Sequence, residues 1–287
     1  MRLLSAIIYF IAYRLMRYRR SIVRGNLQAS FPEKGETERR TVERRYYHHL
    51  ADLLVEGIHN LYASPAAIMR RYRVVNRELL RPYYERGQSV VLMSAHYNNW
   101  EYMVTSLGMQ FLHHGIGVGK PLQDKLTASF LSRRRTRYGT HVVDHRDVRQ
   151  EVEYFQRHRV PCALMMLSDQ SPSNPEKSYW TTFLHQDTAF LYGAEYFARK
   201  YNLPVFYYTV TKPRRFHYEV TLEPLCLEPL AVPQYSIVES YARRLEQQIV
   251  AQPEYWLWSH RRWKLHRPPP TDHRPLTTAH CPLPTSH

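Results

Sequence analysis

Residues 88–101 read QSVVLMSAHYNNWE, and this stretch decides the class of fold. The apolar run at 88–95 follows Gly87 and has the length and the β-branched content of a buried strand. A polar cluster ends the run, and a helix is predicted from about Asn99 to His113. A strand followed directly by a helix is the unit from which α/β sheets are built.

The rest of the chain continues this alternation. Apolar positions recur at three- and four-residue steps in the predicted helices, which cover 36–62, 147–158 and 234–251. Further apolar runs predict strands over 160–167, 203–211 and 216–222. The last two strands are predicted to be antiparallel because their connection is short. We therefore predict an α/β fold with a mixed, mostly parallel sheet flanked by helices.

The N-terminal segment is apolar and then basic. Residues 3–12 read LLSAIIYFIA, which is about half the ~20 residues that a spanning helix needs. Arginines follow the apolar run and no small-residue cleavage site does, so a secretory signal is not predicted. We expect a membrane-associating helix that lies in the interface or inserts as a short anchor. The alternatives are a spanning helix whose first half precedes the present start and a buried N-terminal helix.

These features predict three regions. Residues 1–24 form the membrane anchor or interfacial helix, and residues 25–266 form the main α/β domain. Residues 267–287 contain six prolines in 21 residues and are predicted to be a disordered tail.

The overall charge limits the classes of partner. A formal net charge of +15 predicts attraction to nucleic acid, anionic lipid head groups or an acidic protein. The chain carries no nucleic-acid-binding signature such as an RNP motif or zinc finger, so no nucleic-acid partner is predicted. It also lacks metal-ligand spacings such as HExxH, so no metal site is predicted.

His96 and Glu101 are the candidate chemical residues. The predicted strand delivers His96 to its carboxyl end, where ligand sites on α/β sheets lie. Glu101 follows five positions later, where its carboxylate can reach one imidazole nitrogen and favour the imidazolium that forms when the other nitrogen takes a proton. Such a pair can deprotonate a substrate hydroxyl. The alternative is a strand-end histidine beside an unrelated acid.

Four stretches, in this order, resemble the bacterial lipid A biosynthesis acyltransferases, the late lauroyl/myristoyl transferase family within the HxxxxD/E glycerolipid acyltransferase group. They are 96–101 (HYNNWE), 135–139 (RTRYG), 167–170 (LSDQ) and 253–264 (PEYWLWSHRRWK). The resemblance covers the chain from its N-terminal segment to about Lys264. It implies a glycerolipid-acyltransferase-like fold in residues 25–266.

The resemblance implies specific roles. His96 would be the general base and Glu101 its partner, with substrate-binding positions at Asn99, Arg135, Arg137 and Asp169. An arginine there can hold a phosphate or the thioester carbonyl oxygen as it becomes an oxyanion. Asn99 can instead shape the turn, and Arg137 with Asp169 can instead form a scaffold ion pair.

The resemblance also implies the partners and the location. The acyl donor would be acyl carrier protein or acyl-CoA, and the acceptor an anionic lipid A precursor at the cytoplasmic face of the bacterial inner membrane. Positive charge, including Arg133, Arg134 and Arg135, would attract both partners. No cofactor is expected, because the donor thioester supplies the activation.

Other functions stay open at this point. The same O-acyl transfer could use another lipid acceptor, such as an aminolipid, a lysophospholipid or a mannosylated glycolipid. A hydrolase would need a nucleophile, and the chain has no G-x-S-x-G motif, which leaves only Ser168 or Asp169. A non-enzymatic nucleic-acid binder lacks a signature. An inactive lipid-binding relative is disfavoured by the intact His96 and Glu101.

Overall fold

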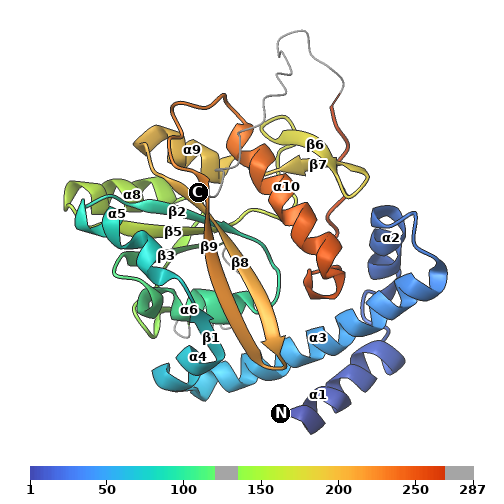
Figure 1. Ribbon diagram of the computed structural model, residues 1–287. Helices are drawn as coiled ribbons and strands as arrows, with labels where there is room; N and C mark the ends of the chain where they lie inside the picture. The colour runs from blue at the N-terminus through green and yellow to red at the C-terminus, as the bar shows by residue number, and fades with distance from the viewer. Residues whose placement is uncertain (120–134, 269–287) are drawn as a thin grey trace. The chain divides into compact units, whose positions relative to one another are not determined.

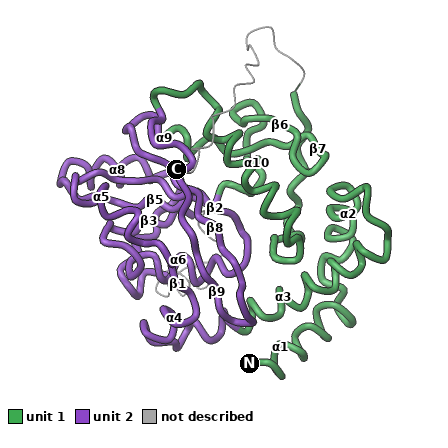
Figure 2. The backbone as a smooth tube through the Cα atoms, in the orientation of Figure 1, with its two compact units in different colours: residues 1–55, 168–196, 230–287 green, residues 56–167, 197–229 purple. Residues whose placement is uncertain are grey.

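A computed structural model describes residues 1–119 and 135–268 (Figure 1). The chain divides into two compact units (Figure 2). Unit 1 comprises residues 1–55, 168–196 and 230 onward, and unit 2 comprises residues 56–167 and 197–229. The chain passes from one unit to the other within the helices α3 (Glu36–Tyr62) and α9 (Gly193–Tyr201), and in the segments near residues 168 and 230.

The described part of unit 2 contains a seven-stranded sheet with the order β1-β9-β8-β2-β5-β3-β4. Its strands are β1 (Tyr72–Val74), β2 (Val90–Ser94), β3 (His114–Gly119), β4 (His141–Asp144), β5 (Cys162–Leu167), β8 (Val205–Arg214) and β9 (His217–Cys226). Only the β8–β9 pair of this sheet is antiparallel. The prediction of a mixed, mostly parallel sheet is therefore confirmed, as is the antiparallel order of the last two strands.

Strand β2 lies inside the sheet, between β8 and β5. All five of its residues are buried, which explains its continuous apolar sequence, because a parallel strand covered on both faces shows no polar alternation. In register, Ser94 at the end of β2 pairs with Leu167 at the end of β5. The carboxyl ends of these two strands therefore leave the sheet side by side.

Helices cover the sheet of unit 2. They are α4 (Pro65–Arg71), the 3-10 helix η2 (Arg77–Leu80), α5 (Arg81–Glu85), α6 (Trp100–Gln110) and α8 (Val148–Arg157). Helix α6 packs against β3, β1 and α4, and α8 packs against β4. Tyr102, Met103 and Leu107 of α6 are fully buried in the sheet core, and the four-residue step from Met103 to Leu107 places these two side chains on one face of the helix.

Unit 1 is built mainly from helices. It contains α1 (Arg2–Tyr9), the π-helix η1 (Phe10–Leu15), α2 (Arg20–Ser30), most of α3, α10 (Ser236–Ala251), the 3-10 helix η3 (Pro253–Tyr255) and the hairpin of β6 (Tyr179–Phe183) with β7 (Gln186–Phe190). The predicted apolar face of α10 is confirmed, because Tyr241, Leu245 and Ile249 are all fully buried.

Most predicted elements are present, and helix α3 has the predicted bounds. Helix α6 ends at Gln110, three residues before the predicted end, because Phe111 is extended and leads into β3. Strands β1, β3 and β4 and the β6–β7 hairpin were not predicted from the sequence. Strand β3 reads HGIGVG, and its three glycines remove the side chains that would give a strand pattern.

Within residues 1–119 and 135–268, no helix combines the length and apolar character needed to cross a bilayer. The membrane association predicted for residues 1–24 stays a prediction. Most of the predicted disordered tail, residues 269–287, lies outside the described residues.

Gly108 allows helix α6 to approach the loop at residues 138–139. A methyl carbon added at Gly108 would lie 2.6 Å from the carbonyl carbon of Gly139 and 2.8 Å from the carbonyl oxygen of Tyr138. Because backbone atoms cannot rotate away as a flexible side chain does, the helix or the loop would have to shift. By contrast, a methyl carbon added at Gly57 in α3 would meet no atom within 4 Å.

We expect Gly108→Ala to lower the free energy of unfolding by about 1–3 kcal/mol, because it overpacks a close backbone contact. Gly57→Ala is the matched control and should raise the free energy of unfolding by up to about 1 kcal/mol, through helix propensity alone. Urea denaturation followed by circular dichroism measures both changes. Equal stability of the Gly108→Ala variant and the wild type would contradict the close approach.

Candidate active site

His96 lies two residues beyond the end of β2, in the middle of the unit 2 sheet. The side chain is half-buried, and its ring packs edge-on against Trp100, with 5.4 Å between ring centroids and an interplanar angle of 62°. Ser94, the last residue of β2, is held to the neighbouring strand β8, because its hydroxyl donates a hydrogen bond to the Tyr208 carbonyl oxygen at 2.9 Å. The histidine therefore projects from a rigid strand end.

The turn after His96 is held by two buried asparagines. Asn98 has a φ of 54°, a left-handed conformation that asparagine tolerates better than most residues. Its side-chain nitrogen donates to the Val210 carbonyl oxygen on β8 at 2.9 Å. Asn99 caps helix α6, because its side-chain oxygen accepts a hydrogen bond from the Tyr102 backbone nitrogen at 2.8 Å.

Glu56 completes the support of this turn, and the sequence analysis did not single it out. Its carboxylate is fully buried, and one oxygen accepts hydrogen bonds from the Asn99 amide at 2.9 Å and from the Tyr218 hydroxyl at 2.7 Å. The signal in the sequence is an acid inside the apolar run of α3, DLLVEGI, at residues 52–58. An acid buried at such a position needs donors from elsewhere in the fold.

Glu101 lies in the first turn of α6 and pairs with Arg135. The guanidinium donates two hydrogen bonds to the carboxylate, at 2.6 Å from Nη2 and at 3.3 Å from Nε. Each side chain retains about a quarter of its full exposure, so the pair sits at the surface of the site rather than in the core. The hydrogen bond predicted between His96 and Glu101 stays a prediction.

Arg137 contacts the backbone of α3. Its guanidinium donates to the Leu61 carbonyl oxygen at 2.9 Å and lies over the Tyr138 ring, 5.1 Å from the centroid. Tyr138 in turn donates to the Ala63 carbonyl oxygen at 2.6 Å. These contacts anchor the segment that carries Arg135. Arg133 and Arg134, the other members of the predicted basic run, lie outside the described residues.

Asp169 belongs to unit 1, where it is almost fully buried. One carboxylate oxygen accepts a hydrogen bond from the Trp256 indole nitrogen at 2.9 Å. Arg262 is also buried there; burial lowers the pKa of its guanidinium to about 10, and the charge of Asp169 opposes that shift. Within unit 1, these contacts are those of a residue that stabilises the fold. The predicted role of Asp169 in substrate binding stays a prediction.

Trp256 and Trp258 are also buried in unit 1, in edge-on contact with each other at 4.8 Å between centroids. Their burial indicates that these two tryptophans pack the interior of unit 1. Trp258 donates from its indole nitrogen to the Pro253 carbonyl oxygen at 2.6 Å, which closes the segment after α10.

Unit 2 therefore brings together most of the predicted site: His96, Asn99, Glu101, Arg135 and Arg137 all belong to it. Both ends of the Asn99 amide are used inside the protein, so the structure gives this residue a clear role in shaping the turn. The site combines an imidazole at a strand end, a carboxylate five residues later in the chain and a guanidinium that binds this carboxylate. Such a set of groups is suited to proton transfer beside an anionic or polarised group.

Comparisons with known proteins identify the family of the chain. The sequence profile of the bacterial lipid A biosynthesis acyltransferases matches residues 1–265. The chain is also similar to the lipid A biosynthesis lauroyltransferase of Escherichia coli (strain K12), with 24% identity over 259 residues that cover 88% of this chain and 82% of that protein. Because the profile spans nearly all of its length, the chain belongs to the bacterial lipid A biosynthesis acyltransferase family.

Proposed function

We propose that this protein transfers a fatty acyl chain from an acyl thioester to a hydroxyl group of a lipid A precursor. Membership of the acyltransferase family and the similarity to a lauroyltransferase support this proposal. The observation that carries the chemistry is the placement of His96 at the carboxyl end of β2, on a turn anchored by Asn98 and Asn99.

In the proposed reaction, one imidazole nitrogen of His96 takes the proton of the acceptor hydroxyl as the oxygen attacks the thioester carbonyl carbon. The new C–O bond gives a tetrahedral oxyanion, which collapses and breaks the C–S bond. The imidazolium then returns the proton to the departing thiolate. Atoms and charge balance without an added cofactor, and the products are an ester and a free thiol.

Glu101 has the role of stabilising the imidazolium in this sequence, because a nearby carboxylate favours the protonated form of histidine. Arg135 supports Glu101 through two hydrogen bonds that hold the carboxylate in place. Arg135 is thus a positioning residue for Glu101. Its guanidinium would also attract a negatively charged group of a substrate.

The proposed donor is acyl carrier protein or acyl-CoA. Both carry negative charge, so the net charge of +15 favours encounter with either one. The proposed acceptor is an anionic glycolipid at the cytoplasmic face of the bacterial inner membrane. The same chemistry on an aminolipid, a lysophospholipid or a mannosylated glycolipid is the alternative, because His96 and Glu101 define the reaction and not the acceptor.

The N-terminal helices provide the proposed membrane contact. Along α1 and η1 the apolar side chains of Leu3, Ile7 and Phe10 are 77%, 48% and 55% exposed, and they follow a helical spacing. Arg14 and Arg17 come next in the chain, as expected for side chains that contact anionic head groups. We propose that this segment lies in the interface and brings the enzyme to its lipid acceptor.

His96→Ala should lower kcat by about 10²–10⁴-fold, the usual contribution of a general base. The measurement is transfer of a radiolabelled acyl group from acyl carrier protein to a lipid A precursor by the detergent-solubilised protein. His158→Ala is the control, because this exposed histidine lies at the end of α8 and contacts only local backbone and a neighbouring ring among the described residues. Transfer that survives the His96 substitution would exclude this residue as the base.

Arg135→Gln should lower kcat by about tenfold or more, because it removes a charged partner from Glu101. Arg135→Lys keeps the charge but not the two-pronged geometry and should recover part of the loss. KM for the donor distinguishes the roles: a positioning residue changes mainly kcat, whereas a residue that only binds the donor changes mainly KM. Unchanged kcat in both variants would rule out support of Glu101.

Ile7→Glu combined with Phe10→Glu should weaken binding to vesicles that contain anionic phospholipid by at least about tenfold, because two apolar contacts are replaced by negative charge. Leu227→Glu with Leu230→Glu is the matched control, since both leucines are exposed and lie far from α1 in the sequence. Vesicle flotation measures the binding. Equal losses in the two double variants would indicate a general charge effect and contradict an N-terminal membrane contact.

A further inference from the structure

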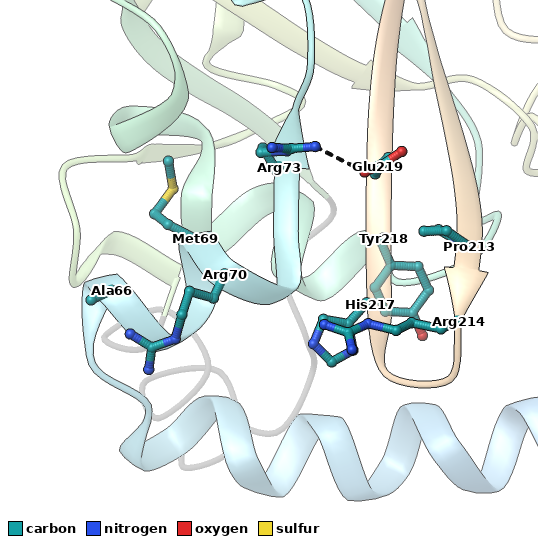
Figure 3. A pocket seen from close by; sticks show the side chains of 9 residues that line it. All are labelled: Ala66, Met69, Arg70, Arg73, Pro213, Arg214, His217, Tyr218 and Glu219. Atoms are coloured by element: carbon teal, nitrogen blue, oxygen red, sulfur yellow. Dashed lines mark hydrogen bonds and ion pairs between the residues drawn. The ribbon is translucent and has the colours of Figure 1, made fainter.

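Unit 2 has a cavity of about 600 Å³ that none of the predicted site residues lines. Its walls come from α4, from β1 and from the end of the β8–β9 hairpin (Figure 3). Pockets of roughly 300–1,000 Å³ are typical of small-molecule sites, so this one is large enough for an organic ligand.

The walls of this cavity are strongly basic. Arg70 comes from α4, Arg73 from β1 and Arg214 from the hairpin, and the lining also includes one carboxylate, Glu219 (Figure 3). Glu219 is already paired with Arg73, at 3.0 Å between Oε1 and Nη2. Within residues 1–119 and 135–268, no hydrogen bond or ion pair engages the side chain of Arg70 or Arg214.

Further positive charge lies on the same hairpin, which reads KPRRFH at residues 212–217. The Lys212 ammonium is 5.9 Å from the ring centroid of Tyr218, a residue that also lines the cavity. Cations gathered in this way repel one another, and a bound anion would relieve that repulsion.

His217 adds a directional donor or acceptor. Its Nδ1 lies 3.2 Å from the Arg215 carbonyl oxygen, and a carbonyl only accepts, so Nδ1 carries the hydrogen in this contact. The other ring nitrogen, Nε2, is then the one that can accept a hydrogen bond from a ligand hydroxyl.

Apolar residues line the cavity as well, namely Ala66, Met69 and Pro213. A free anion would use the guanidinium groups but make no use of these apolar residues. The lining thus suits a ligand with an anionic group and an attached organic part, which matches the mixed polar and apolar character of ligand pockets in general.

We propose that this cavity binds the phosphate group of a phosphorylated ligand through Arg70, Arg73 and Arg214. Phosphate suits these residues better than carboxylate does, because its three or more acceptor oxygens can each receive a guanidinium hydrogen bond. The phosphate can belong to a lipid head group or to a soluble compound. The inference does not depend on the proposed acyl transfer, because it concerns binding by residues other than His96 and Glu101.

The test compares two double variants that each remove two exposed positive charges. Arg70→Gln with Arg214→Gln changes the cavity, and Arg157→Gln with Arg159→Gln changes exposed arginines at the end of α8. One arm titrates inorganic phosphate and follows its phosphorus-31 line width. The other arm measures flotation with phosphatidylcholine vesicles that contain phosphatidic acid, against phosphatidylcholine alone. Circular dichroism checks that all variants are folded.

The cavity variant should lose at least about tenfold in affinity, because two charge-assisted contacts are removed, while the control should lose little. Loss in the phosphate arm supports binding of the free anion, and loss in the vesicle arm alone assigns the site to a lipid head group. Equal losses in the two double variants, or no binding by the wild type in either arm, would overturn the proposal.

A single variant adds a test in the opposite direction. Glu219→Gln releases Arg73 from its ion pair and removes the one carboxylate that lines the cavity. It should raise the affinity for phosphate by about two- to fivefold, the range expected for loss of an exposed ion pair. A fall in affinity would contradict the assignment, since damage to the fold weakens binding and does not strengthen it.

Discussion

The buried carboxylate of Glu56 is the interaction on which the candidate site depends. It joins three parts of the chain that are remote in sequence, because it lies on α3 and accepts hydrogen bonds from Asn99 before α6 and from Tyr218 on β9. Loss of a hydrogen bond to such a buried carboxyl group costs roughly 1–3 kcal/mol, so these contacts hold the three parts in one arrangement. Asn99 then fixes the start of α6, the helix that carries Glu101 in its first turn.

The sequence predicted the elements that carry this site better than it predicted their support. The strand at β2 and the helix α3 were evident because each has a long, regular apolar pattern. The four motifs predicted the family, which the profile match confirms. Glu56 was missed because its partners come from residues 99 and 218, and no local pattern records a contact across such separations. The Glu101–Arg135 pair was missed for the same reason, although both residues were singled out one by one.

The positively charged residues of the chain are expected to have more than one role. Arg135 is engaged by Glu101, whereas the arginines at the end of α4 and on the β8–β9 hairpin face a cavity. Tyr218 belongs to both regions, because it lines this cavity and donates to Glu56. An anion in the cavity would therefore lie near one residue, Tyr218, that also supports the turn after His96 through Glu56.

The central claim is that His96 acts as a base beside the negative charge of Glu101. The most direct test is a double-mutant cycle on kcat/KM for acyl transfer, with His96→Ala, Glu101→Gln and the variant that carries both substitutions. Residues that act as one catalytic unit lose their effects together, so Glu101→Gln should lower kcat/KM when His96 is present and change it little when His96 is absent. Equal losses from Glu101→Gln with and without His96 would contradict a shared role.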